Sequence, residues 1–195
     1  TSGTAKLLKN CARVADIGIH YSHASIRAAY ICGEAARFRN NRAGWIQVFE
    51  DAGYQCEFLA TTQIEAGELA KRNYAVFVLP FSVALSTKEA DALRRYVSDG
   101  GLLLADGKCG LMTLHCRTLD QGVVDDLFGV VRTAVDPLLA SRDGQLRLTD
   151  AGRSFGLDSQ IFDVEVAEPN LAAGDGSALC GHGSTPLLIR RQTGA

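Results

Sequence analysis

The strongest candidate for chemistry is a cysteine in the turn DGKCG at 106–110, which follows a short apolar segment. Nearby glycines can expose a thiol, and a neighbouring lysine lowers its pKa toward the nucleophilic thiolate. His115 and Cys116 come soon after Cys109, and His182 is the only later histidine. These residue types would suit a cysteine-dependent hydrolase, with Cys109 as nucleophile and His115 or His182 as its base.

A structural role for Cys109 is the stronger interpretation. A nucleophile on a sharp strand-to-helix turn follows the strand directly, where this chain has Asp106. No His-x-Glu pair follows the cysteine either. We therefore predict no catalytic residue in this chain and keep Cys109 as the alternative. A zinc site built from Cys109, His115, Cys116 and His182 has no recognised spacing, so neither a metal nor another cofactor is expected.

Two further histidines follow the first strongly apolar segment. His20 and His23 lack a third ligand nearby in the sequence, so we predict hydrogen-bonded surface side chains and no metal site. Open α/β sheets bind ligands at the carboxyl ends of their strands, where His20, Phe81 and Asp106 would lie. A small-ligand module that uses these three residues is a third interpretation. The chain contains neither G-x-G-x-x-G nor a phosphate loop, which disfavours a nucleotide enzyme.

The elements that position these residues alternate between strands and helices. The apolar run AVFVL at 75–79 is typical of a central parallel strand covered on both faces. Ser86 and Glu89 form a capping box that begins a helix. The alternation predicts an α/β fold, a flavodoxin-like three-layer sandwich with a mainly parallel sheet. Strands are predicted at 13–21, 56–59, 75–79 and 102–105, helices at 42–52, from 86 and at 123–128, and a loop or extra helix within 22–54.

The last part of the chain has a different pattern. Segments 145–148, 161–166 and 186–191 alternate apolar and polar residues between glycine-rich turns, which predicts antiparallel edge strands. We expect one domain over 1–195, with a parallel core at 1–139 and a β-rich extension at 140–195. Because the sequence starts without methionine and stops after a strand that looks unfinished, we expect a piece excised from a longer chain.

Composition excludes several classes of protein. The chain has 195 residues, 47% of them hydrophobic, and a formal charge of −2. It can bury a core, and it has no overall charge to attract nucleic acid or an anionic membrane. No apolar run approaches the roughly 20 residues that span a bilayer. Six cysteines without a Cys-x-x-Cys pair predict reduced thiols and a cytoplasmic protein.

A basic segment with interleaved aromatic residues is the candidate contact surface. Such a pattern suits nucleic acid, but the slightly acidic chain favours a solvated helix face or a subunit contact. Trp45 is predicted to fill the core instead. The segment comprises Arg27, Tyr30, Arg37, Phe38, Arg39, Arg42 and Trp45.

The order of motifs carries a family resemblance over about residues 13–139. The motifs are AGWIQVFEDAGY at 43–54, CEF at 56–58, YAVFVLP at 74–80, LRRYV at 93–97, GGLLLAD at 100–106, VDDLFGV at 124–130 and DPL at 136–138, with PLLIRRQTG at 186–194 near the end. Together they resemble the class I glutamine amidotransferase-like domain of glycoside hydrolase family 42 β-galactosidases, also called the β-galactosidase trimerisation domain.

The resemblance implies a non-catalytic accessory or oligomerisation domain of a glycoside hydrolase. Its partners would be other copies, with a trimer suggested by the family name, and an upstream catalytic barrel. Glycoside cleavage needs two carboxylates about 5 to 10 Å apart. Asp125 and Asp126 are adjacent on a predicted helix and would point to different sides. The amidotransferase motifs Gly-x-Cys-x-Gly and His-x-Glu are not matched, which leaves an amidotransferase relative using Cys109 as the alternative.

Overall fold

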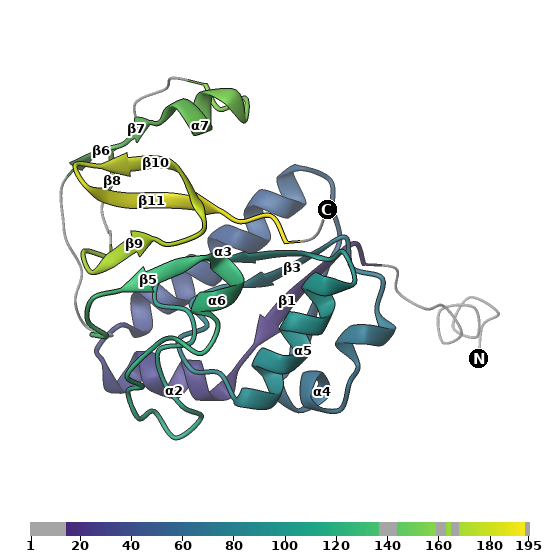
Figure 1. Ribbon diagram of the computed structural model, residues 1–195. Coiled ribbons are helices and arrows are strands. Elements are labelled where there is room, and N and C mark those ends of the chain that lie inside the picture. Colours follow the sequence, from purple (N-terminus) through teal and green to yellow (C-terminus); the bar gives the residue numbers. More distant parts are fainter. Residues whose placement is uncertain (1–14, 137–143, 159–162, 165–167, 194–195) are drawn as a thin grey trace, which may run out of the picture.

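A parallel four-stranded sheet forms the centre of the protein (Figure 1). The computed structural model describes residues 15–136, 144–158, 163–164 and 168–193. The strand order is β2-β1-β3-β4, and every neighbouring pair is parallel. The predicted α/β class with a mainly parallel sheet is therefore confirmed. The strands are β1 (Ile17–Tyr21), β2 (Cys56–Ala60), β3 (Val76–Leu79) and β4 (Leu102–Ala105).

Helices connect the parallel strands. The interval predicted to hold a loop or extra helix contains α2 (His23–Ile31), whose first turn is capped by the Ser22 side chain accepting from the Ser25 amide. The helix predicted from residue 42 begins earlier, as α3 (Ala35–Asp51). Its first turns bury only Phe38, so their apolar periodicity is weak. The other connections are α4 (Thr61–Glu65), the 3₁₀ turn η1 (Leu69–Lys71) and α5 (Thr87–Ser98).

The two faces of the sheet are covered by different helices, which gives three layers. Ile17 and Ile19 point to α3, where Trp45 and Phe49 pack against them. Val48, predicted on the same apolar face of α3, is instead 59% exposed. With 3.6 residues per turn, Val48 lies at the margin of the apolar stripe of α3, outside the contact between α3 and the sheet.

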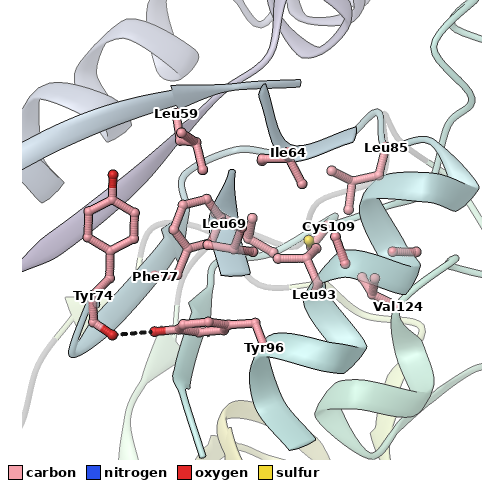
Figure 2. Close-up of a cluster of buried hydrophobic side chains, with 13 residues drawn as sticks. Leu59, Ile64, Leu69, Tyr74, Phe77, Leu85, Leu93, Tyr96, Cys109 and Val124 are labelled. Atoms are coloured by element: carbon pink, nitrogen blue, oxygen red, sulfur yellow. Dashed lines mark hydrogen bonds between the residues drawn. The ribbon is translucent and has the colours of Figure 1, made fainter. Parts of the chain in front are cut away.

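The opposite face carries the larger core (Figure 2). Leu59 and Phe77 from the sheet and Leu93 from α5 are fully buried there. The Tyr96 hydroxyl donates to the carbonyl of Tyr74 at 3.1 Å, so this aromatic ring is also held by a hydrogen bond. Each fully buried side chain of this size contributes about 1.5 to 3 kcal/mol.

The last part of the chain forms small antiparallel sheets beside the parallel one (Figure 1). Strands are found at each predicted segment: β6 and β7 overlap 145–148, β8 lies within 161–166, and β11 overlaps 186–191. Residues 161–162 and 165–166 lie outside the described residues. The elements are α6 (Asp125–Phe128), β5 (Val130–Arg132), β6 (Gly144–Gln145), β7 (Arg147–Leu148), α7 (Asp150–Ser154), β8 (Asp163–Val164), β9 (Leu171–Ala173), β10 (Ser177–His182) and β11 (Thr185–Arg190).

One strand pair joins the predicted core segment to the predicted extension. β5 pairs antiparallel with β9, and the Gly129 carbonyl accepts from the amides of Gly174 and Gly176. The two segments thus share backbone hydrogen bonds. Whether 1–139 and 140–195 fold as one unit stays a prediction.

The helices and the cysteines relate to the cellular environment of the protein. Among the described residues, no helix combines the length and apolar character needed to cross a bilayer. The five described cysteines form no disulfide with one another, and Cys11 lies outside the described residues, so the reduced state stays a prediction.

Gly18 in β1 is required by close packing. A Cβ atom there would lie 2.5 Å from Phe77 and 2.6 Å from Tyr74, whereas one at Gly44 in α3 would meet nothing within 4 Å. We expect Gly18→Ala to destabilise the protein by about 1 to 3 kcal/mol through overpacking. Gly44→Ala should stabilise it by about 0.5 to 1 kcal/mol because glycine is a poor helix former. Urea unfolding followed by circular dichroism measures both, and a neutral Gly18→Ala would contradict the packing.

Candidate functional site

Asp106 connects three elements at the carboxyl edge of the sheet. It follows β4 directly, and its Oδ1 accepts the Phe81 amide at 2.7 Å. Its Oδ2 accepts the indole N–H of Trp45 on α3 at 2.9 Å. Phe81, just after β3, has φ +46°, a left-handed conformation that non-glycine residues rarely adopt. The carboxylate therefore holds a strained turn in place, as strained backbones require from their surroundings.

Burial sets the protonation of this carboxyl. It raises the pKa of Asp106, while the hydrogen bonds from Trp45 and Phe81 act in the opposite direction without cancelling the rise. Asp106 nonetheless keeps part of its surface accessible and lines a pocket. Of the three strand-end residues named for a small-ligand site, Asp106 lines this pocket, whereas His20 and Phe81 do not.

A second charged group links α6, β5 and the extension. The Arg132 guanidinium on β5 pairs with Asp125 of α6 and with Glu168, whose Oε1 accepts Arg132 Nε at 2.5 Å. Glu168 also accepts the backbone N–H of Lys108 at 3.1 Å. The Arg132 and Glu168 side chains are only 5% and 8% exposed. Loss of one partner would leave a buried charge unpaired, which typically costs about 3 to 5 kcal/mol.

Asp125 and Asp126 diverge as predicted. Asp125 faces Arg132, while Asp126 binds Arg94 on α5 at 2.8 Å. Burial raises the pKa of Asp125, and Arg132 opposes that rise. The hydrogen bond from Arg94 lowers the pKa of Asp126.

The ion pairs of Arg132 with Asp125 and Glu168 are called the Arg132 network below. Asp106 and the Arg132 network border one pocket of about 410 Å³ between the sheet and the antiparallel strands. Trp45 and the side chains of β11 contribute to its walls. Sites for small molecules have volumes of about 300 to 1,000 Å³ and apolar walls with a few polar groups. The pocket, which the sequence did not reveal, is the candidate binding site of this protein.

The structure places Cys109 inside the core. Its sulfur lies among Leu85, Leu93 and Val124 (Figure 2), and the residue is 3% exposed. Burial raises the pKa of the Cys109 thiol, with Asp106 adding to the effect. A thiolate is therefore disfavoured at this position.

The other residues of the cysteine hypothesis lie elsewhere. His115 and His182 are exposed, and only Cys109 of the three lines the pocket. His, Cys, Asp and Glu side chains in the described part of the chain form no group of three that could hold a metal ion, so Cys109, His115, Cys116 and His182 do not assemble a zinc site.

His20 is buried, and the prediction of a surface histidine was wrong. It is 3% exposed, with Nδ1 2.8 Å from Ser82 Oγ and Nε2 2.9 Å from Glu89 Oε1. The reason is topological: β1 lies between β2 and β3, so α5 covers the end of the strand. His23, one turn later, is exposed as predicted.

Glu89 joins the predicted helix cap to this histidine. Its amide donates to Ser86 Oγ and its Oε2 accepts the Ser86 amide, which confirms the capping box. Burial raises the pKa of Glu89, but the hydrogen bonds from His20 and Ser86 outweigh it and leave the pKa below the ordinary value. Serine, histidine and carboxylate here resemble a catalytic triad, yet Ser82 is 1% exposed. The network is consequently structural.

The residues of the basic segment make different contacts. Arg37 pairs with Glu34, and Arg42 lies over the ring of the buried Phe38 at 5.3 Å. Trp45 is only partly buried and binds Asp106, so the expectation that it fills the core was incomplete. Of the seven residues, Arg27, Tyr30 and Arg39 are exposed.

Comparison with known proteins shows which class of fold this is. No protein-family model and no curated protein sequence matches the chain. Solved structures do, among them Gan42B, a GH42 β-galactosidase from G. stearothermophilus, with a TM-score of 0.71 and 14% identity over 92% of this chain. A β-galactosidase from Bifidobacterium adolescentis has a TM-score of 0.52 and 22% identity over 88% of this chain and 78% of its own.

A third structure extends the likeness beyond β-galactosidases. An exo-β-1,4-mannosidase from Opitutaceae bacterium strain TAV5 has a TM-score of 0.55 and 11% identity over 93% of this chain and 30% of its own. This chain spans only 26% of Gan42B. The chain thus has the fold of a small α/β domain that occurs within GH42 β-galactosidases, as the motif order predicted. At these identities the likeness establishes the fold, and function needs its own argument.

We expect Cys109 to react slowly with iodoacetamide. The thiol is buried and its pKa is raised, whereas Cys116 is partly exposed. Mass spectrometry of the folded chain should show alkylation of Cys109 about tenfold slower than that of Cys116. Rapid modification of Cys109 with an apparent pKa below about 7 would support the nucleophile instead.

The raised pKa of Asp106 predicts a pH-dependent stability. A carboxyl group whose folded-state pKa exceeds its unfolded value of about 3.9 stabilises the folded state fully at a pH below the unfolded value. This contribution is lost as the pH rises through the folded-state pKa. The unfolding free energy of Asp106→Asn relative to wild type should therefore rise from about pH 4 to about pH 7.

Asp126→Asn is the matched control with the opposite sign. The pKa of Asp126 is lowered, so its contribution is present above the unfolded pKa and lost as pH falls. Relative to wild type, this variant should lose stability as pH rises through the acid range. Identical pH trends for the two variants, measured by urea unfolding, would contradict the assignment.

Proposed function

We propose that this chain is a non-catalytic accessory domain of a glycoside hydrolase, that it belongs to a longer chain with a catalytic barrel, and that it helps to build a homo-oligomer. One observation carries the proposal: the fold likeness covers 92% of this chain but 26% of a GH42 β-galactosidase. This coverage is what we expect for a small domain that is compared with a complete multidomain enzyme. The activity itself would belong to the barrel.

The chemistry of the described residues supports a non-catalytic role. Cys109 is enclosed by the core, Ser82 is inaccessible, and Asp125 and Asp126 serve different arginines.

An apolar surface supports the oligomerisation role. Tyr30 and Ile31 end α2 and are 63% and 73% exposed. They lie within or beside the basic segment that was predicted as a contact surface. Exposed aromatic residues next to arginines, here Arg27 and Arg39, are enriched at protein interfaces. We propose that this end of α2 contacts another copy.

Sedimentation equilibrium tests the oligomer. We expect the chain to sediment as a multiple of its 20.8 kDa mass, and Tyr30→Ser with Ile31→Ser to shift it to the single mass. Tyr54→Ser is the control, since Tyr54 is 51% exposed after α3 and outside the surface. A wild-type monomer at every concentration would contradict the role in assembly. Hydrolysis of nitrophenyl β-galactoside by the chain alone would contradict the non-catalytic role.

A further inference from the structure

The pocket beside Asp106 is lined by two kinds of side chain. Apolar side chains come from Leu104 of β4, Phe128 of α6, Leu171 of β9, and Leu187 and Ile189 of β11. Polar side chains come from the carboxyl groups and Arg132. A ligand that fills this volume of about 410 Å³ must therefore combine an apolar body with a polar end.

The polar part of the lining has more acidic than basic side chains. Among the described residues it contains the carboxyl groups of Asp106, Asp125 and Glu168 and the guanidinium of Arg132. Arg132 directs its N–H groups to Asp125 and Glu168. Lys108 is not among the residues that line the pocket, but its backbone N–H donates to Glu168 and its ammonium group also interacts with the Glu168 carboxylate.

Asp106 is the carboxyl group that a ligand can use. Its hydrogen bonds come from neutral donors, among them the Phe81 amide, the Trp45 indole and the Asn41 side chain. None of these donors neutralises the charge of the carboxylate, which a bound ammonium group would do. Trp45 lines the pocket beside it, and indole rings attract cations.

We propose that this pocket binds a small organic cation, with its ammonium group at Asp106 and its apolar body against β11. The charge balance selects a cation over an anion, and the leucine-rich wall selects an organic amine over a metal ion. The site is independent of the oligomerisation role and of any parent enzyme. Burial raises the pKa of both Asp106 and Asp125, and a bound ammonium would lower both by supplying the missing positive charge.

Three probes of similar shape test whether binding depends on the charge of the ligand. Benzylamine, benzyl alcohol and benzoate share a ring and differ in the charge of the polar end. The chain has one tryptophan, so its single indole N–H signal in a nitrogen–proton NMR spectrum reports on the pocket directly. We expect benzylamine to shift this signal saturably and to bind about tenfold more tightly than benzyl alcohol, as one charge-assisted hydrogen bond allows. Benzoate should leave it unchanged.

Variants then assign the site. Asp106→Asn should weaken benzylamine binding about tenfold, while Asp126→Asn, which lies outside the pocket lining, should bind like wild type. If Asp106→Asn does not fold, the probe series on the wild-type chain still decides. An unchanged indole signal with benzylamine, or equal binding of benzyl alcohol, would overturn the proposal. Tighter binding of galactose than of benzylamine would overturn it in favour of a neutral sugar.

Discussion

The carboxyl edge of this protein depends on one carboxylate, Asp106. It accepts from the amide of a strained residue after β3 and from an indole on α3, so one side chain ties two strands and a helix together. The hydrogen bond to Phe81 helps to stabilise the turn because the left-handed backbone conformation of Phe81 costs about 1 to 3 kcal/mol of conformational energy. The same position faces a pocket, so the group that stabilises the edge is also the group that a ligand would meet.

The Arg132 network has a similar double effect. It joins the extension to the parallel layer through Glu168, and among the described residues it supplies the guanidinium of the pocket lining. Because its members are nearly buried, loss of one partner would leave an unpaired charge. The pocket therefore exists only where the two parts of the chain meet, which neither part can provide alone.

Several residues of reactive types are held by contacts within the fold. The turn after β4 has positive φ at Lys108 and Gly110, and the chain between them places the thiol of Cys109 in the core. His20 likewise serves a buried hydrogen bond that orients Glu89 at the cap of α5. Hydrogen bonds and ion pairs within the fold engage these polar groups, and the pocket beside Asp106 is the candidate place for recognition.

Local patterns in the sequence determined the alternation of strands and helices, the capping box at Ser86, and the divergence of Asp125 from Asp126, since each depends on neighbours a few residues apart. The contacts that define the site join residues far apart in the chain: Trp45 with Asp106 over 61 positions and His20 with Glu89 over 69. Periodicity carries no information about such partners, because strand order and helix placement bring them together. Only the tertiary structure could therefore decide that His20 is buried, that the cysteine turns inward, and that a charged pocket forms beside β4.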